Sequence, residues 1–183
     1  MDINTRVKQY TQVKPTPVRR SGQTYDQTYH FVRRALKICL FVYRRLTVAD
    51  QTARLIRDTI DFLLRRYHGY CIKEHIGAHY REVGLKPRDK TDFEHVIPAN
   101  LARDMLIHDV ITIDEALNIP TCKLRRRHHQ QLHEDSLGAT TPDLAEFWQR
   151  YKGLNIKVET YDGTPVDMKT WTLADHYRYF DIA

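Results

Sequence analysis

Two runs of apolar residues at helical spacing follow one another between residues 26 and 67, and they constrain the fold more than any other feature. The first run is Tyr29, Val32, Leu36, Leu40 and Tyr43. The second run is Ala53, Ile56, Ile60, Leu63 and Tyr67. Each is typical of the buried face of an amphipathic helix. Thr47, with Asp50 three residues later, predicts the start of the second helix, and Gly69 predicts its end. We therefore expect an antiparallel helical hairpin.

The predicted hairpin is strongly basic. Residues 33 to 66 carry nine basic and three acidic side chains, and the whole chain has a net charge of +6 and a pI near 9.2. Such a balance favours a polyanionic partner. Nucleic-acid contacts are expected from Arg33, Arg34, Arg44 and Arg45, although an ordinary solvated helix surface can have the same composition.

The chain of 183 residues has the length of one domain. Its pattern predicts an α+β fold that is mainly α-helical, in four parts. Residues 1–24 are expected to form a flexible basic arm, and residues 25–86 a helical region that binds nucleic acid. Residues 87–138 are expected to form a small finger of strands and a helix, and residues 139–183 a C-terminal packing region of helix, β-hairpin and helix.

A third helix is expected over residues 70–83, at the end of the helical region. It brings potential metal ligands onto neighbouring turns: His68, Cys71, His75 and His79. A competing apolar stripe runs through the same turns: Ile72, Ile76, Tyr80 and Val83. We favour a partly buried histidine-rich face here, and no structural zinc is expected.

The three cysteines, Cys39, Cys71 and Cys122, are widely separated in the sequence. This spacing indicates neither a disulfide framework nor a four-cysteine zinc site, and it fits a reducing cytoplasm. The sequence shows no apolar leader and no uninterrupted hydrophobic helix, so no membrane association is expected.

Within the finger, the order of elements is strand, helical insert, strand, helix. A loop leads into a short strand that Pro98 ends. Two short helices follow, the second of them opened by Thr112 with Glu115 three residues later. The extended run "PTCKL" and the basic segment "RRRHHQQLHEDSLG" then predict a second strand and a helix.

This finger contains the residue types that phosphodiester hydrolysis requires. Glu94 and His95 offer a metal ligand and a titratable base. Histidines at His128, His129 and His133 lie on the following basic helix, where the last two share a face. Nearby cations suited to phosphate binding are Lys90, Lys123, Arg125, Arg126 and Arg127.

Taken together, the segments Glu94 to Pro98 and Asn118 to Cys122, with the histidines that follow, resemble the H-N-H signature of the ββα-metal, or His-Me finger, endonucleases found in phages and as homing enzymes. The resemblance covers about 40 residues. It implies that His95 is the general base and that Asn118 orients it. It also implies that Glu94 and a later histidine bind one divalent metal ion. Mg²⁺ is the first expectation for this ion, and Mn²⁺ is the alternative.

The resemblance implies a DNA endonuclease, with double-stranded DNA as the expected partner and RNA as an alternative. It would work in the cytoplasm of a bacterial or phage-infected cell, and a homodimer would suit symmetrical cutting of both strands. Asn118 equally fits a helix C-cap before Pro120. Two other classes compete: a non-catalytic nucleic-acid-binding protein, and a phage or bacterial protein that inhibits a host enzyme.

Overall fold

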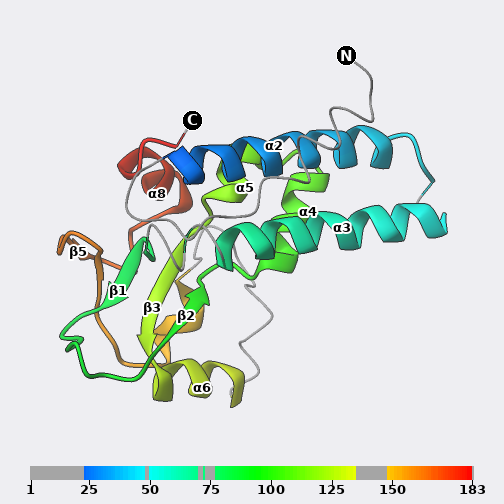
Figure 1. Cartoon of the computed structure of the whole chain (residues 1–183). Helices are drawn as coiled ribbons and strands as arrows, with labels where there is room; N and C mark the ends of the chain where they lie inside the picture. The colour runs from blue at the N-terminus through cyan, green and yellow to red at the C-terminus, as the bar shows by residue number, and fades with distance from the viewer. Residues whose placement is uncertain (1–22, 48–49, 70–71, 73–76, 135–147, 183) are drawn as a thin grey trace.

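The computed structural model describes residues 23–47, 50–69, 72, 77–134 and 148–182. Over these residues the protein is α+β and mainly helical, which confirms the predicted class (Figure 1). The predicted arm falls almost entirely on residues 1–22, which lie outside the described residues.

The predicted helical hairpin is confirmed. Helix α2 (Gln23–Tyr43) and helix α3 (Gln51–Tyr67) lie side by side, joined by a short connection (Figure 1). Leu36 and Ile60 are fully buried between the hairpin and the rest of the protein. The predicted N-cap at Thr47 is wrong, because Asp50 caps α3 by accepting a hydrogen bond from the Thr52 backbone N–H over 2.7 Å.

The predicted helix over residues 70–83 is wrong in its last part. Residues Tyr80–Glu82 form strand β1, and Tyr80 pairs with both Cys122 and Thr160. Gly77 has a φ of +97°, so a right-handed helix cannot continue through this residue into β1. Cys71 and His75, two members of the histidine-rich cluster, lie outside the described residues.

The described part of the chain forms a five-stranded mixed sheet in the order β2-β3-β1-β4-β5. Strand β2 (Thr91–His95) pairs antiparallel with β3 (Thr121–Arg125), and β1 lies parallel to β3. These two strands confirm the predicted extended runs on either side of the insert. The predicted finger thus shares one sheet with strands from the segments before and after it.

Two short helices connect β2 to β3, as predicted. Helix α4 (Ala99–Ile107) starts after Pro98, and helix α5 (Ile113–Leu117) has the expected capping box between Thr112 and Glu115. Both helices pack against the hairpin and bury apolar side chains such as Leu106 and Leu117. The insert therefore joins the helical and sheet parts into one core (Figure 1).

The remaining elements complete the sheet side of the molecule. Helix α6 (Arg126–Glu134) follows β3 directly, and helix α7 (Gln149–Lys152) precedes the hairpin of β4 (Val158–Thr160) and β5 (Pro165–Val166). Helix α8 (Leu173–Tyr179) closes the fold with a capping box at Thr172. The predicted C-terminal hairpin and last helix are confirmed. Among the described helices, none is long and apolar enough to cross a membrane.

Candidate metal centre

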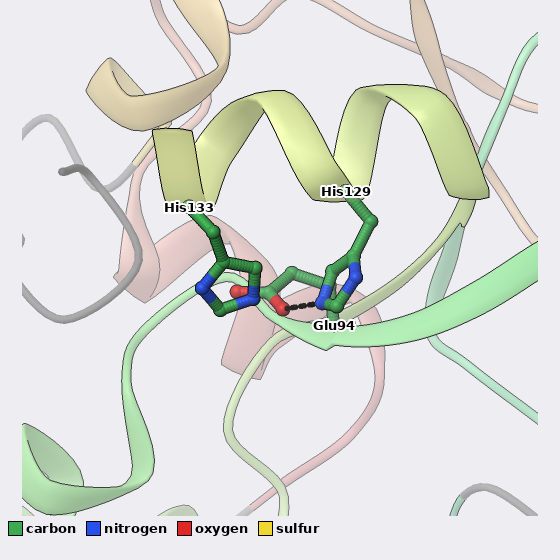
Figure 2. Close-up of side chains that lie close together, drawn as sticks. All are labelled: Glu94, His129 and His133. Carbon is green, nitrogen blue, oxygen red and sulfur yellow. Dashed lines mark hydrogen bonds and ion pairs between the residues drawn. The ribbon is translucent and has the colours of Figure 1, made fainter. Parts of the chain in front are cut away.

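Strand β2 and helix α6 bring Glu94 to two histidines. Helix α6 begins where β3 ends, with the Arg126 backbone N–H donating to the Lys90 carbonyl over 2.9 Å, and buried Leu132 packs it against the sheet. His129 and His133, one helical turn apart, then share the face that looks onto β2. Figure 2 shows both rings pointing from α6 toward the Glu94 carboxylate.

The three side chains form a compact set of potential ligands. Nε2 of His129 lies 2.8 Å from Oε2 of Glu94, and the rings of His129 and His133 meet edge to face with centroids 4.8 Å apart. One ligand atom from each of the three residues lies within 4.8 Å of the others. Glu94 is buried while His133 is exposed, so the cluster opens to solvent on the His133 side.

A buried arginine holds the far side of Glu94. Nη2 of Arg150, from α7, donates to Oε1 of Glu94 over 2.7 Å, and its Nη1 donates to the carbonyl oxygens of His95 and Val96 over 2.8 and 3.1 Å. The Arg150 side chain is 0% exposed. One carboxylate oxygen is therefore fixed by Arg150, and the other faces the histidines.

A second carboxylate lies behind His129. Nδ1 of His129 is 3.5 Å from Oδ2 of Asp92. The other carboxylate oxygen of Asp92, Oδ1, lies 3.3 Å from Nη2 of Arg126. Asp92 and Glu94 are two residues apart on β2 and therefore lie on the same face of the strand. A carboxylate on the outer nitrogen of a ligand imidazole orients the ring and fixes its tautomer.

The donor set suits a transition metal better than Mg²⁺. Two imidazoles and one carboxylate are the ligands of many Zn²⁺ sites and of two-histidine-one-carboxylate Fe²⁺ sites. Magnesium, in contrast, prefers oxygen ligands in an octahedral arrangement. Three ligands also leave coordination positions for water or substrate, which the exposed side at His133 would admit.

The structure does not bring His95 to this cluster. Nε2 of His95 contacts Nδ1 of His68 at 3.1 Å, and the His68 ring in turn bonds the Ala116 carbonyl at 3.0 Å. Adjacent residues on a strand face opposite ways, which accounts for the separation of the Glu94 and His95 side chains. Burial, followed by the nearby His68 and Arg65, lowers the pKa of His95 well below its usual value.

His128 also lies outside the cluster. Its Nδ1 is 2.9 Å from Oε2 of Glu82, a buried carboxylate on β1 that also accepts bonds from the backbone and guanidinium of Arg125. Burial alone would raise the pKa of Glu82, but hydrogen bonds from Arg125 and His128 hold it below its usual value. His128 thus ties α6 to β1, and of the three candidate histidines only His129 and His133 lie beside Glu94.

Asn118 occupies the alternative position considered for it, a helix C-cap. Its side-chain Nδ2 donates to the Asp114 carbonyl over 2.8 Å at the end of α5, and its own carbonyl is 2.8 Å from Nε2 of His176. Both groups are engaged within the fold at the end of α5. The structure does not bring Asn118 to His95.

The predicted cations differ in their surroundings. Arg125 is bound to Glu82, Asp89 and the Gly84 carbonyl. Arg33 forms a bidentate bond with Asp114, and Arg44 pairs with Asp109. The remaining predicted cations are exposed on the finger or on α2 and its C-terminal turn: Lys90, Lys123, Arg126, Arg127, Arg34 and Arg45. The exposed set is the better candidate for phosphate contact.

Sequence reasoning missed Arg150, Asp92 and Glu82. Asp92 had a recognisable signal, because it lies two residues before Glu94 on the predicted strand. Arg150 had none, since it lies 56 residues beyond Glu94 in a segment expected only to pack. Glu82 was assigned to a helix, which concealed its place beside Arg125.

Comparisons of the chain with protein families, with curated proteins and with solved structures found no match.

Proposed function

We propose that the protein is a divalent-metal-dependent endonuclease that hydrolyses phosphodiester bonds in DNA. The observation that carries this proposal is the convergence of Glu94 with His129 and His133 within 4.8 Å. The elements that present them, an antiparallel strand pair followed directly by a helix, have the order expected for a ββα-metal finger. The long helical insert between the strands distinguishes this finger from a simple hairpin.

We assign the metal ligands to Glu94, His129 and His133, with Arg150 and Asp92 as the residues that orient them. The two imidazoles favour Mn²⁺ or Zn²⁺ ahead of the Mg²⁺ that the resemblance implies. When bound, such an ion supplies a Lewis acid that polarises the phosphoryl oxygens. Arg150 keeps Oε1 of Glu94 occupied, so that Oε2 stays directed at the helix.

For His95 we propose a positioning role in place of the general base. Its ring bonds His68, and its backbone carbonyl accepts from Arg150, so both groups hold the end of β2. His95→Gln should therefore retain measurable cleavage, whereas a general base would lose roughly 10²-fold to 10⁴-fold. Loss in that range with an unchanged thermal midpoint would restore the base assignment.

DNA is the proposed substrate because exposed cations lie on the finger. Lys90 precedes β2, Lys123 lies on β3, and Arg126 and Arg127 open α6, all of them exposed. Exposed cations of this kind bind phosphates without reading sequence. RNA remains an alternative substrate, which a parallel assay on single-stranded and double-stranded RNA separates.

A plasmid assay tests the proposal. Supercoiled DNA is incubated with purified protein and Mg²⁺, Mn²⁺ or Zn²⁺, and nicking is compared among wild type, Glu94→Gln, His133→Ala and His108→Ala. His108 is an exposed histidine at the end of α4, so its variant is the matched control. We expect cleavage by wild type and His108→Ala only, abolished by EDTA. Nicking that survives EDTA or the Glu94 substitution would refute the mechanism.

One observation favours the second function, a non-catalytic nucleic-acid-binding protein. Glu94 is already paired with Arg150 and His129, so the cluster can serve as an ion-pair network that fastens α6 and α7 to β2. In that case wild type binds DNA without cutting it. No calorimetric signal for Mn²⁺ or Zn²⁺ would then appear, and Glu94→Gln would lower only the thermal midpoint.

A further inference from the structure

The hairpin has a second apolar surface besides the one it buries. Five large apolar side chains of α2 and α3 are between 51% and 65% exposed: Phe31, Ile38, Phe41, Leu55 and Phe62. Single exposed apolar residues are ordinary, but a group of this size on two adjacent helices is typical of an interaction surface. We call these five residues the outer apolar face.

The five residues lie on the outward side of their helices. At 100° per residue, Ile38 is about 160° around α2 from buried Leu36, and Phe62 about 160° around α3 from buried Ile60. Both helices pack inward against α4 and α5, through the ion pairs Arg57 to Asp104 and Arg33 to Asp114. Because α2 and α3 are adjacent and share the same inward side, their outward stripes face the same side of the molecule.

Basic side chains surround the outer apolar face. Exposed arginines lie on both helices and in the turn after α2: Arg34, Arg45, Arg54 and Arg66. The guanidinium of Arg45 lies over the Phe41 ring at 3.4 Å from its centroid. Among the described side chains of α2 and α3, Asp58 is the one exposed acid. Asp58 lies one turn from both Leu55 and Phe62, so the surface combines apolar side chains with a charge that is mainly, but not wholly, positive.

We propose that the outer apolar face binds an acidic amphipathic helix of another protein. Apolar residues at spacings of three, four and seven on such a helix would cover Ile38, Leu55 and Phe62, and its carboxylates would meet the arginines. This proposal goes beyond the nuclease function and does not depend on a metal ion.

Charge and shape argue against three other occupants. A second copy of the chain would bring two mainly positive surfaces together, which costs free energy at a symmetric interface. Residues 1–22 carry five basic side chains and one acid, a charge that does not complement the arginines of α2 and α3. Single-stranded nucleic acid stacks on aromatic rings, but it would leave the aliphatic side chains of Ile38 and Leu55 exposed to water.

A displayed library of helical peptides tests the proposal. Peptides of about four helical turns carry apolar residues at fixed positions and random charges elsewhere. They are selected on the whole wild-type protein and counter-selected on Ile38→Asp/Phe62→Asp. Both substituted residues are exposed, so circular dichroism should show an unchanged fold. We expect the enriched peptides to be strongly acidic.

Affinity measurements with one enriched, labelled peptide complete the test. Binding should weaken by at least about tenfold in Ile38→Asp/Phe62→Asp and in Arg45→Glu/Arg66→Glu. It should be unchanged in Val110→Asp, which places a charge on an equally exposed apolar residue between α4 and α5. Three results would overturn the proposal. The selection enriches neutral or basic peptides, or none at all. The wild-type protein is a dimer that the Ile38→Asp/Phe62→Asp substitutions disperse, or it binds a single-stranded oligonucleotide that this variant does not bind.

Discussion

Arg150 and Glu94 form a buried ion pair, with Nη2 of Arg150 2.7 Å from Oε1 of Glu94. The same guanidinium donates to the carbonyl oxygens of His95 and Val96, so α7 holds both the carboxylate and the end of β2. A buried charge that loses its partner pays the full cost of its desolvation. The pair therefore couples the stability of the fold to the orientation of the candidate metal ligand.

Arg150→Met should lower the free energy of unfolding by about 3–5 kcal/mol, because it leaves Glu94 buried without its cation. Urea titration at pH 7 measures the loss. Arg178→Met is the matched control, since Arg178 lies on α8 with its side chain 79% exposed, and it should change stability by less than about 1 kcal/mol. Equal effects of the two substitutions would show that the Arg150 pair has no special importance.

Asp92→Asn should weaken the binding of Mn²⁺ or Zn²⁺ by roughly 10-fold to 100-fold, because a neutral amide supports the outer nitrogen of His129 less strongly than a carboxylate does. Isothermal titration calorimetry measures the affinity. Asp89 lies just before the same strand, but its carboxylate pairs with Arg125. The Asp89→Asn variant should therefore bind the metal ion with wild-type affinity. An unchanged affinity in Asp92→Asn would remove Asp92 from the site.

Protein stability should fall as the pH drops from about 6.5 to about 4, in part because of His68. Burial lowers the pKa of His68 to about 4, while the unfolded chain takes up the proton near 6.5. The unfolded state thus binds more protons within this window, and stability declines as the pH falls through it. The contribution of His68 is about 3 kcal/mol, fully present above the window and lost below it.

His68→Gln isolates this contribution. The glutamine amide can still donate to the Ala116 carbonyl, but it does not titrate. The difference in unfolding free energy between pH 7 and pH 4 should therefore be smaller in His68→Gln than in wild type. His108→Gln, at an exposed position, should retain the wild-type difference. An identical pH profile in all three proteins would contradict the assignment.

The finger cations should divide into two groups in DNA binding. Lys123→Ala and Arg127→Ala, at exposed positions, should each reduce the slope of log affinity against log salt by about 0.9 if the side chain neutralises one phosphate. Arg125→Ala should lower the thermal midpoint instead, because Arg125 satisfies the buried carboxylate of Glu82. An unchanged slope in both exposed variants would place the DNA elsewhere.

The sequence predicted most of the secondary structure because the signals were local. Thr112 and Thr172 open helices with complete capping boxes, and the turn at Gly163, with a φ of +96°, joins β4 to β5. The helix over residues 70–83 failed for the opposite reason. The apolar residues there fit a helical period, but Tyr80 and Glu82 are buried by pairing with strands more than 40 residues away.

The candidate site was predicted in part. The meeting of Glu94 with His129 follows from the order of strands and helix, which the sequence shows. The neighbour of Glu94, His95, was expected to join it, but strand alternation directs His95 to His68. The guanidinium that binds Glu94 belongs to Arg150 on α7, and no local sequence pattern links Arg150 to strand β2.

The position of β1 between β3 and β4 limits how this protein can be divided. A fragment cut to residues 87–138 would strip β3 of its parallel neighbour and leave that edge open to aggregation. It would also lose Glu82 from beneath His128 and Arg150 from behind Glu94. Anyone who grafts Glu94, His129 and His133 onto another scaffold must therefore supply an equivalent of Arg150, or accept a loosely held carboxylate.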